Sequence, residues 1–314
     1  MQREADAKAT RYVASALKQR ERLTPGQRRD SIRTSDNNQY PINMFTYQSR
    51  FLKRGEVWFD NQPNGERVDW ILYRNRSAPV PGAKSRNFYN RLVDLSKTPE
   101  ALLADMEPRT VAKIKTAEEQ DKFSCEWRLV TDARGLDEIE LMWNQSIEAK
   151  RRWGNLNREW LGKMIAARSF ELASARDPSG TLVVFGGMFR DKYRVQQLMS
   201  VSPPRSALIP AVRARTNRAS CFLLWKTMLR FKEEGVRYFD FGGWYPGNED
   251  IQLLGANAFK KSLGGQVVRE FECEQMVTLK GWLLLTAARF VARAKEIRPE
   301  NTEILEVHPN EATA

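Results

Sequence analysis

Residues 238–265 read YFDFGGWYPGNEDIQLLGANAFKKSLGG, and this stretch says more about the fold than any other part of the chain. Three of the four residues at 238–241 are aromatic, with Asp240 among them, which predicts a strand that ends at two glycines. Residues 250–262 have helical spacing, and the Gly-Gly pair at 264–265 is typical of a helix end. A strand, two glycines and a short helix in this order predict a turn whose backbone can approach a ligand closely.

Upstream of this stretch the apolar pattern is regular from Cys125 onward. Alternating residues predict strands, and apolar residues three and four apart predict helices. Short turns at 178–180 and 191–192 join the three central strands. The expected order is a strand at 125–131, helices at 136–150 and 157–167, strands at 170–175, 181–190 and 193–201, a helix at 219–234, a strand at 238–241, a helix at 250–262 and a strand at 266–274.

This order combines an antiparallel meander with crossover helices. It predicts an α/β (α+β) fold with a mixed, mostly antiparallel sheet and helices on both faces. Neither GxGxxG nor GxxxxGK[ST] occurs in the sequence, so a doubly wound dinucleotide-binding sheet and a P-loop have no support.

The rest of the chain is expected to form flanking segments. Residues 57–60 and 68–74 have the pattern of short strands, and Thr98 followed by Pro99 is a helix-start signal. The expected segments are a disordered basic extension at 1–40, a truncated N-terminal portion at 41–95, the main domain at 96–280, and a C-terminal helix with a polar tail at 281–314.

Composition narrows the class of function. The net charge of +12 favours anionic partners such as coenzyme phosphates, RNA or lipid headgroups, although a solvated basic surface explains it equally well. The only histidine is His308, in a polar tail, which disfavours hydrolases that need an imidazole base and zinc enzymes with histidine ligands. Three scattered cysteines favour neither a disulfide framework nor a zinc site. No signal sequence and no run long enough to cross a bilayer are found, so a cytoplasmic location is expected.

The motif at 240–243, followed by FKKSLGG at 259–265, resembles the D-x-G-G…F-K-x-x-x-G signature of the Fem-type aminoacyltransferases, a branch of the GNAT superfamily. The R-x-x-x-x-I-x-x-A-E core of that family has its counterpart in Arg109, Ile114, Ala117 and Glu118. The resemblance covers about residues 90–275. It implies a GNAT fold whose sheet splays between the strands 193–201 and 238–241.

The resemblance also implies a place for the acyl donor. The pantetheine arm of acyl-CoA would enter the splay and bond to the strand backbone at Met199, Val201 and Ser202. The pyrophosphate would lie where the next helix begins, because free N–H groups at a helix start bind anions. This chain lacks the usual glycines there, and a solvated basic loop is an equal alternative. The residues expected to hold phosphate are Arg213, Arg215, Arg218, Ala219 and Ser220.

Three residues near the glycine pair are candidates for chemistry. By the resemblance, Lys260 would stabilise the negative charge that develops as an amine attacks an acyl group; a surface lysine paired with a carboxylate is the alternative. Asp240 could act as the amine base or could cap the glycine turn. Tyr245 could protonate a leaving thiolate or could simply pack in the domain.

Three functions remain open at this point. The first is acyl transfer from acyl-CoA to an amine by direct attack, and the second is transfer from aminoacyl-tRNA to a cell-wall precursor. The third is a non-catalytic GNAT-fold protein that binds an anionic partner. No tightly bound cofactor and no metal are expected. The acceptor could be lipid- or glycan-linked, and the apolar stretch 281–294 could rest in a membrane interface or pack on the domain.

Overall fold

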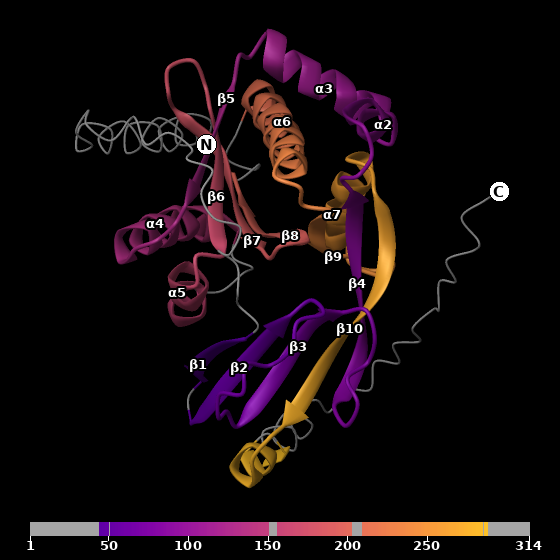
Figure 1. The fold of residues 1–314 in the computed structure, drawn as a ribbon. Coiled ribbons are helices and arrows are strands. Elements are labelled where there is room, and N and C mark those ends of the chain that lie inside the picture. Colours follow the sequence, from indigo (N-terminus) through magenta and orange to yellow (C-terminus); the bar gives the residue numbers. More distant parts are fainter. Residues whose placement is uncertain (1–43, 50, 151–155, 203–208, 285, 288–314) are drawn as a thin grey trace, which may run out of the picture. The chain divides into compact units, whose positions relative to one another are not determined.

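The structure is a computed structural model that describes residues 44–49, 51–150, 156–202, 209–284 and 286–287 (Figure 1). Its contacts divide the chain into two units. Within the described residues, unit 1 comprises 93–241 and unit 2 comprises 44–92 together with 242–287. The expected extension at 1–40 and most of the expected C-terminal tail lie outside the described residues.

Unit 1 contains five neighbouring strands in the order β9-β8-β7-β6-β5. Neighbouring strands from β5 to β8 are antiparallel, whereas β8 and β9 run parallel. A parallel pair needs a crossover connection, and helix α6 provides it. The strands are β5 (Ser124–Leu129), β6 (Phe170–Arg176), β7 (Leu182–Arg190), β8 (Arg194–Val201) and β9 (Tyr238–Gly243).

The helices of unit 1 cover its strands. Helix α6 packs against α3, β6 and β7, and α4 packs against α5 and β8. Figure 1 shows α6 on one side of these strands and α4 and α5 on the other. The side chains of Phe222, Trp225, Met228 and Phe231 recur every three residues along α6 and are all buried, so this face holds the core. The helices are α2 (Pro99–Ala104), α3 (Pro108–Glu119), α4 (Ala133–Lys150), α5 (Arg158–Ala166) and α6 (Pro210–Glu233).

Unit 2 combines an N-terminal segment with the C-terminal part of the chain, in the strand order β1-β2-β3-β10-β4. Strands β2 and β3 are parallel and the other neighbours are antiparallel. A small core forms around Met44, Val57, Ile71, Tyr73 and Cys273. The elements are β1 (Phe45–Ser49), β2 (Leu52–Trp58), β3 (Trp70–Arg76), β4 (Lys84–Asp94), α7 (Ile251–Ser262) and β10 (Gln266–Met276).

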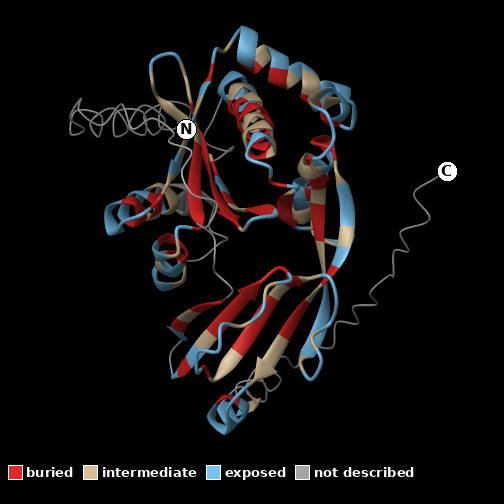
Figure 2. Ribbon diagram, in the orientation of Figure 1, coloured by how far each residue is buried: buried red, intermediate tan, exposed pale blue. Residues whose placement is uncertain are grey.

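The predicted fold class is confirmed, and most predicted elements are present within a few residues. The expected segments 41–95 and 96–280 do not coincide with the two units, because β10 pairs between β3 and β4 and so groups with the N-terminal strands. The buried residues in Figure 2 are concentrated on α6 and along the strands of both units.

Strand β1, the polar part of strand β4 and the first turns of helix α6 were not predicted. Strand β4 begins at Lys84 in a run of polar residues, KSRNFYNR, which lacks the apolar alternation of a strand. It forms because nine of its residues pair with β10. Helix α6 begins at Pro210, nine residues earlier than expected, with proline at its first position, where the missing N–H costs nothing.

Candidate active site

A fork in the sheet of unit 1 is the first feature of the site. Strands β8 and β9 form three ladder pairs, from Arg194 opposite Tyr238 to Gln196 opposite Asp240. Strand β8 continues for five more residues, to Val201, and these pair with β7 on its other side. The two parallel strands therefore meet only at their beginnings. The splay predicted between these two segments is present.

The fork has a local cause in β8. Gly187 of β7 lies opposite Met199, whereas the next residue, Met188, lies opposite Gln197, so Leu198 is an extra residue in β8. Such a β-bulge bends its strand and increases the local twist. Because this bulge follows the last β8–β9 pair by two residues, it turns β8 away from β9 where the ladder ends. Met199, Val201 and Ser202, the predicted donor contacts, all lie beyond the bulge.

Lys260 lies at the end of β9. Its ammonium group donates to the carbonyl oxygen of Gly242 at 3.2 Å and also to that of Gly243. The backbone of Gly242 has φ of +73°, in the left-handed region that glycine tolerates best, so this strand end needs a glycine. The motif that suggested Lys260 thus has a physical basis: the glycines expose carbonyl oxygens, and a cation in the last turn of α7 binds them.

Helix α7 holds the segment after β9 through a second side chain, one turn earlier. The Asn257 side chain accepts from the backbone N–H of Tyr245 at 3.1 Å and donates to the Tyr245 carbonyl oxygen at 2.7 Å. Asn257 is buried. A buried asparagine inside a helix is costly without partners. An asparagine within the predicted helix 250–262 could therefore have indicated a structural contact, although no role was predicted for Asn257.

The Tyr245 phenol itself is only half-buried and covers the backbone of Gly247, where an added Cβ would lie 2.4 Å from the ring. This packing favours a structural role for the ring, and its predicted role as a proton donor stays a prediction. Arg91 supports the same region: it donates to the carbonyl oxygens of Gly264 and Gly265 and stacks on Trp244 with its Cζ atom 5.2 Å from the ring centroid.

Asp240 is fully buried beside the fork. Its Oδ2 atom accepts from Arg194 Nη2 at 2.6 Å and from Nε at 3.2 Å. Both partners lie in the three-pair ladder, so this ion pair ties β8 to β9 just before they separate. The geometry favours Asp240 as an anchor of the fork, and the prediction that it acts as a base stays untested.

The arginines expected to hold phosphate lie within a helix. A helix start at 219 predicts that Arg213, Arg215 and Arg218 lie in the preceding loop, but all three are in α6, which begins at Pro210. Arg218 forms a bidentate ion pair with Asp121, with Nε–Oδ2 and Nη2–Oδ1 distances of 2.5 and 2.8 Å. Arg213 is exposed in the first turn. The expectation of a loop at this position is therefore wrong, while the predicted contact of these arginines with phosphate stays a prediction.

Ala219 and Ser220 are also inside α6, where the backbone N–H groups bond to the helix itself. Ala219 is buried, and the Ser220 hydroxyl donates to the Thr216 carbonyl oxygen at 2.9 Å. They therefore do not begin the helix, and their predicted contact with phosphate stays a prediction. Arg215 lies 3.5 Å from Asp177, whose pKa is lowered mainly by hydrogen bonds from its own turn.

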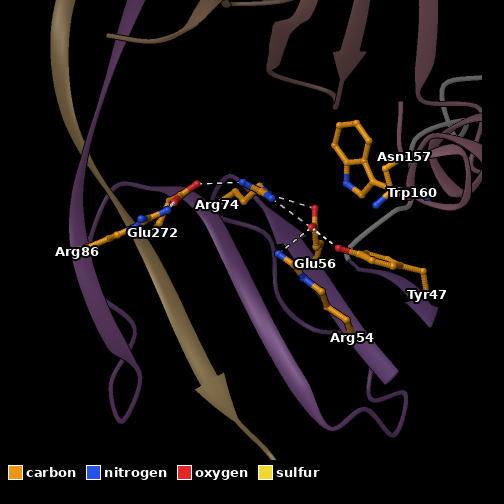
Figure 3. Close-up of polar contacts among 8 residues, drawn as sticks. All are labelled: Tyr47, Arg54, Glu56, Arg74, Arg86, Asn157, Trp160 and Glu272. Atoms are coloured by element: carbon orange, nitrogen blue, oxygen red, sulfur yellow. Dashed lines mark hydrogen bonds and ion pairs between the residues drawn. The ribbon is translucent and has the colours of Figure 1, made fainter. Parts of the chain in front are cut away.

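A second polar cluster crosses the sheet of unit 2 (Figure 3). Arg74 on β3 bridges two carboxylates, Glu56 on β2 at 3.1 Å and Glu272 on β10 at 3.0 Å. The Tyr47 hydroxyl donates to Glu56 at 2.7 Å, and Arg86 binds Glu272. Glu56 and Glu272 are 1% and 3% exposed, so the bonds to these partners offset the cost of burying two carboxylates. Burial, reinforced by the charge of Glu56, raises the pKa of Tyr47 above its usual range. The cluster pairs charges across the strands of unit 2.

Nucleophilic chemistry at a cysteine has no support in the structure. Burial raises the pKa of the Cys125 thiol to about 12 and that of Cys221 to about 11, while Cys273 is fully buried. A thiol with a raised pKa is protonated at pH 8 and reacts slowly, since the thiolate is the nucleophile.

Iodoacetamide at pH 8 should therefore leave Cys125, Cys221 and Cys273 unmodified over the time in which a free cysteine peptide reacts completely. Mass spectrometry of the intact chain checks this. The same reaction in urea, where all three thiols are exposed, is the control. Rapid labelling of Cys125 or Cys221 in the folded chain would show a thiolate and contradict the assignment.

The strand order and the fork define a GNAT-type fold. Comparison with solved structures agrees: the crystal structure of FemX matches with a TM-score of 0.55 at 13% identity, over 77% of this chain and 86% of that chain. The C-terminal domain of a protein named as a lysylphosphatidylglycerol synthetase, from Agrobacterium fabrum, matches with a TM-score of 0.49 at 13% identity, over 79% of this chain and 89% of that one. No protein-family model and no curated protein sequence matches. The predicted Fem-type resemblance is confirmed at the level of the fold.

Proposed function

We propose that this chain is an acyltransferase that moves an acyl group from acyl-CoA to an amine by direct attack. The observation that carries the proposal is the fork between β8 and β9, opened by the bulge at Leu198. Beyond the bulge, the β8 edge that faced β9 is no longer paired with it. Backbone groups in such an edge can hydrogen-bond to an extended ligand as another strand would. The amide-containing arm of acyl-CoA is a ligand of this kind.

The chemistry needs few protein groups. The amine nitrogen attacks the thioester carbonyl carbon, the new C–N bond forms and the C–S bond breaks. The amine loses a proton, and the leaving thiolate takes one up. An oxyanion develops on the carbonyl oxygen, and a fixed cation stabilises it. Lys260 is the cation we assign to this role, because its ammonium is held by carbonyl oxygens at the end of β9. The protonated cysteines favour direct attack over a covalent enzyme intermediate.

Aminoacyl-tRNA is the second candidate donor, and a specific observation favours it. Arg218 binds Asp121, and Arg215 lies near Asp121 and Asp177, so these two cations are already neutralised by the protein. A CoA pyrophosphate would then find less positive charge at α6 than the sequence suggested. The net charge of +12 suits a polyanion such as tRNA. Both donors present an activated carbonyl to an amine, so the role of Lys260 is common to both.

Donor binding is the decisive experiment. A ligand that binds only the folded chain stabilises it by about 2.7 kcal/mol at a hundred times its dissociation constant. We expect acetyl-CoA or a longer acyl-CoA to raise the midpoint of thermal unfolding, and pantetheine alone to raise it less. ATP and uncharged tRNA are the controls for nonspecific anion binding. A shift with charged tRNA alone would select the second donor, and no shift with any donor would leave a non-catalytic binding protein.

A further inference from the structure

An exposed apolar patch follows β10 in unit 2. Of the twelve large apolar side chains that are exposed among the described residues, five fall within the eight residues 277–284. Leu279 is 72% exposed, Trp282 51% and Leu283 53%. Monomeric proteins rarely leave neighbouring large apolar side chains in water without a use for them. The patch consists of Val277, Leu279, Trp282, Leu283 and Leu284.

The patch is exposed because the opposite side of the segment is fixed to unit 2. Residues 279–284 are helical, and Thr278 begins the helix by accepting from the N–H of Gly281 at 3.1 Å. The Thr278 hydroxyl donates to Asp69 at 2.7 Å, and the N–H of Val277 donates to the Asp69 carbonyl oxygen at 2.9 Å. Gly281 is packed so closely that an added Cβ would lie 2.3 Å from that same oxygen.

This anchoring decides which way the apolar face points. Leu279, Trp282 and Leu283 are spaced i, i+3 and i+4, so they share one side of the helix. Gly281 is buried beside the backbone of Asp69, whereas all three large side chains are exposed. The structure therefore presents these side chains outward on a firmly attached helix start.

We infer that this patch binds the surface of an anionic lipid bilayer. Charge is the argument for this occupant: residues 277–295 contain four cations, Lys280, Arg289, Arg293 and Lys295, and no aspartate or glutamate. Lys280 is exposed and lies 3.4 Å from Asp69. Aliphatic side chains and a tryptophan, in a stretch of sequence whose charged residues are all cations, match the interface of a membrane that contains anionic headgroups. None of the helices in the described part of the chain could span a bilayer. This inference goes beyond acyl transfer and does not depend on it.

Vesicle sedimentation tests the inference with the full chain. We expect the chain to sediment with vesicles of phosphatidylcholine and phosphatidylglycerol, and much less with phosphatidylcholine alone or in high salt. The variant Trp282→Ser with Leu283→Ser should lower the partition coefficient about tenfold or more, because two large apolar side chains no longer enter the interface. Both side chains are exposed, so the thermal midpoint in solution should not change.

Ile251→Ser is the matched control, since Ile251 is 83% exposed but lies on α7, outside the patch. It should sediment like the unchanged chain. Equal binding of the Trp282/Leu283 variant, or no binding of the unchanged chain to anionic vesicles, overturns the inference. Analytical ultracentrifugation tests whether a second copy of the chain binds the patch instead. If the unchanged chain forms a dimer that the Trp282/Leu283 variant does not form, and neither binds vesicles, the patch is an interface between two copies.

Discussion

Replacing Lys260 by methionine should lower the turnover number of acyl transfer by about 100- to 1,000-fold, with little change in donor affinity. The reason is the transient charge: the oxyanion exists only while the amine is adding to the carbonyl carbon, so a group that binds it acts on the transition state alone. Loss of one preorganised donor to an oxyanion typically has an effect of about this size. Methionine keeps much of the length and apolar stem of lysine, so α7 should stay packed.

Lys261 provides the matched control. It is the next residue on α7 and is exposed, whereas Lys260 reaches the carbonyl oxygens of Gly242 and Gly243. Lys261→Met removes the same net charge from the same helix end and should leave turnover nearly unchanged. Steady-state kinetics with the donor identified by thermal shift measure both variants. Equal turnover in the Lys260 variant and the unchanged chain would remove the lysine from the chemistry while leaving the donor site intact.

The fold could be predicted largely because its signals are local. In the hairpin turn at 177–181, the Asp177 carboxylate accepts hydrogen bonds from the N–H groups of Ser179 and Thr181. In the turn at 191–194, the Asp191 carboxylate accepts from the N–H of Arg194. The cap of α2 at Thr98, with proline following, has the expected bond from the Ala101 N–H. The motif residues Ile114 and Ala117 are buried, and Glu118 binds Lys226 of α6 at 2.7 Å. The residues of this motif therefore pack α3 against α6.

The errors arise where distant parts of the chain decide the outcome. Strand β4 is polar, and nine of its residues pair with residues of β10 that lie 174 to 190 positions later in the sequence. The Arg194–Asp240 pair joins two strands that are separate in the sequence, and no spacing rule connects them. The apolar pattern predicts a helix start at residue 219, but the helix begins at Pro210, so the arginines lie inside α6. The carboxylates that neutralise Arg215 and Arg218 come from other elements and have no local signal.

Replacing Arg194 by alanine should destabilise the chain by about 3–5 kcal/mol, because it leaves the carboxylate of Asp240 buried without this guanidinium. The side chains are 9% and 0% exposed, so water cannot take over the lost interaction. Chemical denaturation followed by tryptophan fluorescence measures the loss. Arg128→Ala is the control, because its ion pair with Glu138 is exposed on both sides and should contribute about 1 kcal/mol or less.

A double variant distinguishes a structural role of Asp240, as an anchor of the fork, from a catalytic role as the base. Arg194→Gln together with Asp240→Asn replaces the ion pair by two neutral amides that can hydrogen-bond to each other, so it should recover much of the stability lost in either single variant. Asparagine cannot take a proton from an amine. If Asp240 anchors the fork, the double variant should bind donor and turn over within about tenfold of the unchanged chain, since a base contributes about 100-fold or more. A folded double variant that binds donor but has lost that activity would instead make Asp240 the base. Interactions other than the Arg194–Asp240 ion pair would then have to hold β8 and β9 together where the ladder ends.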